Sequence, residues 1–176
     1  MNLRALRAAL SICLVIICIP PMFPQKLEMF NYTSHGDYDL AVPKFDLMKP
    51  EGTQGIAVWK EDTYIHKLFN SVVKSVLPKK KRDMLHLNTA VLLAFTRRGE
   101  VINCKFLLNT DDRNILTEEE LYKIYIKLKR IRINPYKVRI DPDPVAGGTS
   151  PDYAIISGPL ISRTGRERIM LNSDKK

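Results

Sequence analysis

The clearest hydrophobic pattern in the chain lies between residues 64 and 78. Its apolar side chains follow the i, i+3, i+4 spacing that places them on one face of a helix. Asp62 or Thr63 can cap the start of such a helix, and Pro78 stops it. The pattern therefore predicts an amphipathic helix with the apolar stripe Ile65, Leu68, Phe69, Val72, Val73, Val76 and Leu77.

Alternating apolar positions next predict a β-hairpin over residues 87–108. On the first arm, every second residue from Leu87 to Phe95 faces one side, and most of these residues are apolar. Arg97-Arg98-Gly99-Glu100 turns the chain, with Gly99 available for a positive φ. On the return arm, the residues that share a face are Ile102, Cys104, Phe106 and Leu108.

A second helix is predicted to begin at Thr117. Thr117 and Glu120 have the spacing of a capping box, and the acidic residues between them favour the first turn of a helix. Basic residues populate the last turns, and Pro135 ends the pattern. The predicted apolar stripe is Leu121, Ile124, Tyr125 and Leu128.

Outside these elements the patterns are weaker. Residues 136–140 look extended, and Tyr153–Ile161 has the composition of a further strand, interrupted by Gly158-Pro159. The chain therefore predicts an α+β domain over residues 59–162, with two helices packed on a small, mostly antiparallel sheet in the order helix, hairpin, helix, strand. So small a sheet is expected to keep an exposed edge strand.

Turn-forming residues dominate residues 25–58, for example at His35-Gly36-Asp37 and Pro50-Glu51-Gly52. We expect an irregular lead-in there, with a short strand at Gly55–Trp59. Residues 163–176 are polar and are expected to form a tail.

The first 24 residues have the composition of a secretory signal peptide. Arg4 and Arg7 precede the apolar run ALSICLVIICI, and several prolines follow it. The run is short for a membrane span, which needs about 20 apolar residues. We expect a signal peptide over residues 1–24, cleaved near Pro24 or Gln25, and therefore a secreted or periplasmic protein. An uncleaved anchor is the alternative, and it would give the only membrane contact.

Composition and charge change this picture little. A chain with 45% hydrophobic and 27% charged residues is globular rather than fibrous or disordered. Cleavage removes Arg4 and Arg7 and no acidic residue, so the formal net charge falls from +9 to +7. It also leaves Cys104 as the only thiol, so no internal disulfide can stabilise the domain.

One further pattern suggests a family. Phe95-x3-Gly99-x-Val101 is followed by Ile115-Leu116-Thr117-Glu118-Glu119 opening a helix, and then by Ile133-Asn134-Pro135. Over residues 64–136 this order resembles the C-terminal domain of TonB-type proteins. The resemblance implies recognition of a partner strand at a sheet edge. Residues 25–63 contain no long Pro-rich linker, so the resemblance is to a small exported protein with such a domain rather than to a periplasm-spanning energy transducer.

Cys104 is the candidate for chemistry that the sequence makes most obvious. A reactive cysteine needs a base, a cation or a helix N-terminus to stabilise its thiolate. The neighbours of Cys104 on its predicted strand face are Ile102 and Phe106, which would raise the thiol pKa. We therefore interpret Cys104 as a buried structural residue.

The other polar candidates also have structural interpretations. His35, His66 and His86 lack metal-ligand spacing and a paired carboxylate nearby in sequence, so we expect surface or half-buried positions. Capping accounts for Glu118-Glu119-Glu120. Asp141-Pro142-Asp143-Pro144 does not continue into a calcium-binding loop. The sequence thus predicts no catalytic residue, no cofactor and no metal ion.

Lys79, Lys80, Lys81 and Arg82 follow the first helix directly. Their simplest interpretation is a solvated basic run that complements the helix C-terminus. The alternative is a contact with an anionic partner. Export and the lack of an aromatic-interleaved motif argue against nucleic acid.

Taken together, the sequence predicts an exported, non-enzymatic protein-interaction or structural module of the bacterial cell envelope. Its partner would be an envelope protein that pairs with an exposed sheet edge. Two alternatives stay open. One is a small secreted hydrolase or transferase in which Cys104, a histidine or an aspartate pair converge from distant positions. The other is an electrostatic binder of anionic surface polymers through residues 79–82.

Overall fold

A seven-stranded sheet with the order β1-β2-β5-β4-β7-β3-β6 runs through the protein. The computed structural model describes residues 28–46, 50–60, 63–142 and 150–161; the expected signal peptide and polar tail lie outside them. The strands are β1 (Phe30–His35), β2 (Tyr38–Pro43), β3 (Gln54–Trp59), β4 (Ala90–Thr96), β5 (Val101–Asn109), β6 (Val138–Asp141) and β7 (Tyr153–Pro159). All neighbouring strands are antiparallel except β3 and β7.

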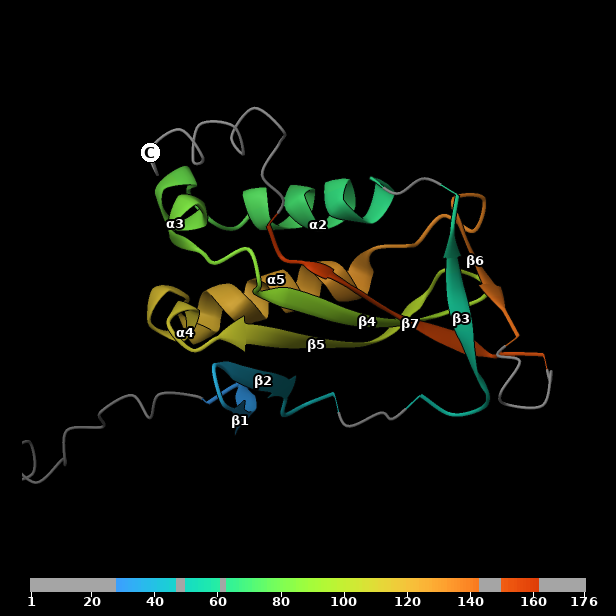
Figure 1. Ribbon diagram of the computed structural model, residues 1–176, viewed down its shortest axis with the longest axis horizontal. Coiled ribbons are helices and arrows are strands. Elements are labelled where there is room, and N and C mark those ends of the chain that lie inside the picture. Colours follow the sequence, from blue (N-terminus) through green and yellow to red (C-terminus); the bar gives the residue numbers. More distant parts are fainter. Residues whose placement is uncertain (1–27, 47–49, 61–62, 143–149, 162–176) are drawn as a thin grey trace, which may run out of the picture.

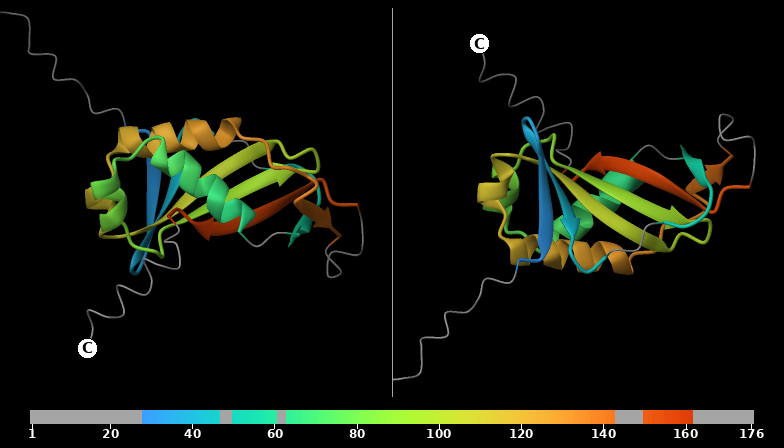
Figure 2. Two further views of the ribbon diagram at one scale, coloured as in Figure 1. Left: turned by 90° about the horizontal axis from the view of Figure 1, so that it is seen from above. Right: turned by 90° about the horizontal axis from the view of Figure 1, so that it is seen from below.

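The helices form one layer on one face of this sheet. The described residues contain α2 (Tyr64–Lys74), α3 (Lys79–Met84), α4 (Asp112–Ile115) and α5 (Glu118–Arg130). α2 lies against β7 and α5 against β5, while none of the described helices covers the opposite face of the sheet (Figures 1 and 2). None of the helices in the described part of the chain is long and apolar enough to span a membrane.

The α+β class is confirmed, but the sheet and the number of helices are larger than predicted. Residues 30–43, expected to be irregular, form a β-hairpin that extends the sheet. Its turn contains Gly36 at φ +64°. The expectation of an irregular lead-in was wrong because β1, with the sequence FNYTSH, is mostly polar and buries only Phe30 fully.

Both predicted helices form, with different ends. α2 buries Ile65, Phe69, Val72 and Val73 but ends at Lys74, ahead of Pro78. α5 begins with the predicted capping box, in which Glu120 N–H donates to Thr117 Oγ1 at 3.2 Å. It ends at Arg130 rather than near Pro135.

The predicted hairpin is confirmed as β4 and β5, in the middle of the sheet. Leu93 lies opposite Cys104, and both side chains are fully buried. Gly99 adopts φ +79° in the connecting turn, as its position predicted. Ile133 N–H donates to Gly99 O at 2.8 Å, which fixes the turn to the segment that follows α5.

Candidate functional site

The uncovered face of the sheet presents a mixed row of apolar and polar side chains. Strand register places Leu92 of β4 beside Lys105 of β5, and Ala94 of β4 beside Ile155 of β7. Ile155 keeps 43% of its surface exposed.

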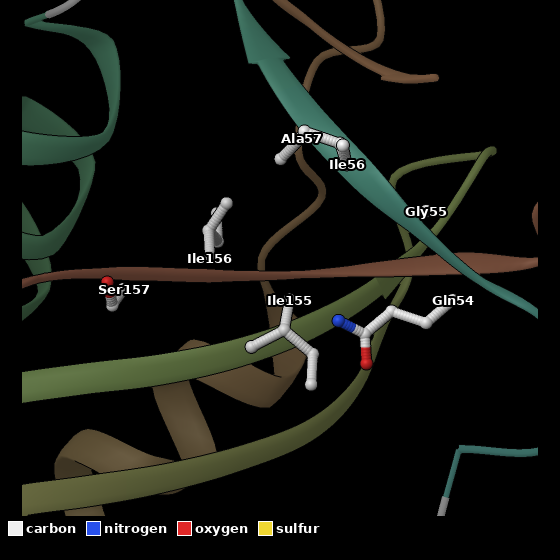
Figure 3. Close-up of a pocket in the computed structure, with 7 residues that line it drawn as sticks. All are labelled: Gln54, Gly55, Ile56, Ala57, Ile155, Ile156 and Ser157. Atoms are coloured by element: carbon white, nitrogen blue, oxygen red, sulfur yellow. The ribbon is translucent and has the colours of Figure 1, made fainter. Parts of the chain in front are cut away.

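The sheet splits at the boundary between β7 and β3. These strands are parallel neighbours over only two residue pairs, Gln54 with Tyr153 and Gly55 with Ala154. β3 then diverges from β7 and pairs with β6 instead (Figure 1). A hollow of ≈ 310 Å³, which we call the fork, opens between the two strands (Figure 3). It is lined by Gln54, Gly55, Ile56, Ala57, Ile155, Ile156 and Ser157.

Hydrogen bonding between β7 and β4 fixes the direction of the β7 backbone groups. Leu160 N–H donates to Thr89 O at 2.7 Å, so the polar backbone groups of Leu160 face the β4 side. These groups alternate in direction along an antiparallel strand. The unbroken register between the two strands therefore turns Ile156 and Gly158 toward β4 as well.

The intervening residues of β7 face the other way, toward β3. Tyr153 N–H contacts Thr53 O at 3.4 Å, which confirms this direction at the start of the strand. The pairing of β7 with β3 stops after Ala154. In the described part of the chain, the N–H and C=O of Ser157 are therefore directed into the fork without a strand to pair with.

Two isoleucines flank the fork. Ile56 on β3 is 47% exposed and Ile155 on β7 is 43% exposed. Figure 3 shows the side chains of Gln54 and Ile155 on one side of the strands and Ile156 on the other. A smaller hollow of ≈ 120 Å³ adjoins the fork at Ile155, and its remaining lining residues are Pro50, Leu92, Ala94, Asn103 and Lys105.

The sheet also loses a neighbour beside β5. β2 pairs with β5 only as far as Phe106, and beyond that point a cluster from α5 takes its place. Lys129 Nζ donates to Ile102 O at 2.8 Å and to Asp46 Oδ2 at 3.0 Å. Tyr125 OH donates to the same Asp46 oxygen at 2.9 Å. This cluster satisfies the carbonyl of Ile102 on the open side of β5.

Cys104 lies in the core, as predicted from its strand face. Its side chain is fully buried, and burial, with a smaller contribution from the charge of Asp46, raises the pKa of the thiol well above its usual value. The charged groups that affect it are Asp46 and Lys129, and no histidine is among them. These surroundings suppress the thiolate that a nucleophile would need.

We predict that Cys104 resists alkylation in the folded protein. The thiolate is the reactive species, and the raised pKa and burial of Cys104 both limit it. Iodoacetamide at mildly alkaline pH, followed by peptide mapping, should leave Cys104 unmodified until denaturant is added. Rapid modification under native conditions would show that the thiol is accessible and would reopen a chemical role.

The structure also brings together a cluster around Asp112 that the sequence did not predict. Asp112, fully buried on α4, accepts hydrogen bonds from His86 N–H at 3.1 Å and from His86 Nδ1 at 2.7 Å. It also accepts one from the Thr89 hydroxyl, whose oxygen accepts from Asn109 N–H at 3.1 Å. His86 and Asp112 are distant in sequence, and only the placement of α4 beside the start of β4 brings them together. The Asp112 carboxylate thus links the loop before β4 to the end of β5.

The Asp112 contact has a measurable effect on His86. The hydrogen bond and charge of Asp112 raise the pKa of His86 above its ordinary value of 6.5. Protonated His86 therefore stabilises the folded state fully below pH 6.5, and this contribution is lost as the pH rises through the higher, folded-state pKa.

We predict that an NMR titration of the folded protein gives His86 a pKa above that of the unfolded chain. In Asp112→Asn the pKa should fall back toward 6.5, because the neutral amide no longer favours the imidazolium. A His86 pKa at or below the unfolded value in the parent protein would contradict the geometry of this pair.

The basic run adopts a short helix, α3, and its four members differ in environment. Lys79 and Lys80 are exposed, whereas Lys81 and Arg82 are half-buried. Lys81 Nζ contacts the Glu120 carboxylate at 2.7 Å, which joins α3 to the start of α5. Lys81 thus has a structural contact. The expectation of a solvated basic run fits Lys79 and Lys80 best.

The remaining polar candidates do not converge. His35 is exposed at the end of β1 and His66 is half-buried on α2. Asp141 contacts Arg139 at 2.9 Å, and Asp143 lies outside the described residues. In the ranges that the structure describes, no group of three or more His, Cys, Asp or Glu side chains is arranged to hold a metal ion.

Comparisons with known proteins add little to this description. No protein-family model and no curated protein matches the sequence significantly. Among solved structures, the chain is similar to a DUF5043 family protein from Bacteroides uniformis, with a TM-score of 0.48 and 11% identity. The similarity covers 76% of this chain and 88% of that one. At this level it assigns neither a family nor a function.

Proposed function

We propose that the protein is an exported, non-enzymatic module that binds another protein of the bacterial cell envelope through the uncovered side of its sheet. The observation that carries this proposal is the fork, where β3 and β7 separate beside the exposed Ile56 and Ile155. Exposed aliphatic side chains next to unpaired strand backbone favour a polypeptide ligand.

Two sequence features support the cellular part of the proposal. Residues 1–24 have the pattern of a secretory signal, and the order of elements over residues 64–136 resembles the TonB C-terminal domain. Domains of that type recognise partner strands at a sheet edge. Export and partner binding are therefore consistent with one another.

The environments of Cys104 and His86 support a binding role over catalysis. The Cys104 thiol is buried with a raised pKa, which suppresses its thiolate. The Asp112 carboxylate accepts from His86 Nδ1, which orients the imidazole and leaves its other nitrogen open. The Thr89 hydroxyl contacts the same carboxylate rather than the imidazole, so it is not placed for His86 to activate it as a nucleophile.

Export can be tested directly on the native product. Fractionation of the host, followed by intact-mass measurement, should place the protein in the periplasm or the medium with residues 1–24 removed. A full-length product that stays in the cytosol would contradict the envelope assignment.

Partner binding can be tested by site-specific cross-linking in the intact host. A photo-reactive residue at Ile155, on the uncovered face, should give an adduct with a defined envelope protein. The same residue at Lys127, exposed on α5, serves as the matched control. Identical adducts from both positions, or none from Ile155, would count against the uncovered face as the binding surface.

A further inference from the structure

The two walls of the fork both present backbone groups to the space between them. On β7 these are the N–H and C=O of Ser157, directed away from β4. On β3, Lys60 N–H donates to Lys137 O at 2.9 Å, so Lys60 faces β6. Alternation along β3 then turns Ala57 toward the fork. Ala57 and Ser157 both line the hollow.

We infer that the fork is a β-strand addition site, in which an extended peptide segment of the partner pairs with the open edge of β7. This inference rests on the proposed function and specifies the chemistry of its ligand. Unpaired strand N–H and C=O groups are matched best by the backbone of another extended chain.

The length of the site follows from β7 itself. Pairing with β3 ends at Ala154, and Pro159 has no N–H to offer to an added strand. Pro159 lies opposite Ala90, at a register position whose backbone faces the fork. The pairing edge is therefore short and centred on Ser157.

The side chains around the fork define what the peptide should carry. Ile56 on β3 and Ile155 on β7 are both exposed, and both line the hollow. An added strand would place every second side chain between these two isoleucines. Cross-strand contacts between aliphatic residues stabilise a sheet, so we expect Val, Ile or Leu at that position of the ligand.

The outer edges of the sheet fit this role less well. β1 is an edge strand, but Asn31, Thr33, Ser34 and His35 are all polar and exposed. β6, the other edge, has only four residues, and Pro142 follows it directly. In the described part of the sheet, neither edge combines unpaired backbone with a hollow flanked by exposed aliphatic side chains.

The test uses a library of capped heptapeptides in which Val, Ile, Leu or Phe alternates with Thr or Lys. Binding to the mature chain is measured by fluorescence anisotropy, and the strongest binder is then resynthesised with single N-methylated amides. Methylation at alternate residues should weaken binding about tenfold or more, because it removes a backbone donor, while methylation at the residues between should have little effect.

The matched protein variants are Ser157→Pro and Ser34→Pro. Both serines are exposed, and both N–H groups point away from the strand that pairs with them. Ser157→Pro should weaken the peptide about tenfold or more, and Ser34→Pro should not. If Ser157→Pro fails to fold, the N-methyl series on the parent protein decides the question.

Each outcome bears on one claim. Strand addition would be overturned if every library member had a Kd above about 1 mM, or if N-methylation did not weaken binding. Loss of binding in Ser34→Pro alone would move the site to β1. An Ile155 cross-link to an envelope protein that persists in Ser157→Pro would leave the proposed function standing without the fork. Peptide binding by a protein that stays in the cytosol would support strand addition at the fork and contradict the envelope role.

Discussion

Gly99→Ala is expected to be among the most damaging single substitutions in the protein. Gly99 adopts φ +79°, and a Cβ there would lie 1.8 Å from Ile133 O. The N–H of the same residue, Ile133, donates to Gly99 O. The Ile133 backbone therefore cannot move away from Gly99 without breaking this hydrogen bond. Strain and clash together should lower the free energy of unfolding by about 3 kcal/mol or more, measured by denaturant titration.

Gly36→Ala is the matched control for Gly99→Ala. Gly36 also has a positive φ, of +64°, but a Cβ added there meets nothing within 4 Å. Only the backbone strain applies, so the loss should be about 1 kcal/mol. Equal losses in the two variants would show that the Ile133 contact does not constrain the β4–β5 turn.

Asp112→Ala is expected to have the second large effect. The substitution leaves the His86 N–H, its Nδ1 and the Thr89 hydroxyl without their shared acceptor. The Thr89 hydroxyl is fully buried, and a buried group left unsatisfied costs about 1–3 kcal/mol, so a loss of that size is expected in the same titration; the exposed His86 ring can bond to water instead. Asp112→Asn, which keeps one acceptor oxygen, should lose less.

Asp111→Ala controls for the removal of an acidic side chain from this loop. Asp111 is exposed, and its side chain makes no capping hydrogen bond to α4. Its loss should change the free energy of unfolding by at most about 0.5 kcal/mol. A loss in Asp111→Ala as large as that in Asp112→Ala would point to the net charge of the loop rather than to the buried contacts.

The sequence predicted the elements in which local pattern and burial agree. α2 and the β4–β5 hairpin carry strong apolar periodicity, and the capping box at Thr117 fixes the start of α5. The β1–β2 hairpin escaped prediction because a polar edge strand buries few side chains. Its turn formers, His35-Gly36-Asp37, resemble those of an irregular segment.

The candidate site was harder to predict, because it depends on contacts between distant parts of the chain. Ile56 and Ile155 both lie on strands that the sequence suggested, yet the fork between them results from the early separation of β3 from β7. The parallel pairing of residues 54–55 with 153–154 joins segments far apart in the chain, so no pattern in the local sequence predicts it. The contact between His86 and Asp112 likewise arises from packing rather than from spacing.

The open edge of β7 is the central claim, and amide hydrogen exchange of the purified protein tests it most directly. The N–H groups of Ile156 and Gly158 face β4 and should be protected, whereas Ser157 N–H faces the fork and should exchange more than about tenfold faster. Protection of Ser157 equal to that of its two neighbours would contradict the account, because it would mean that the edge is already paired.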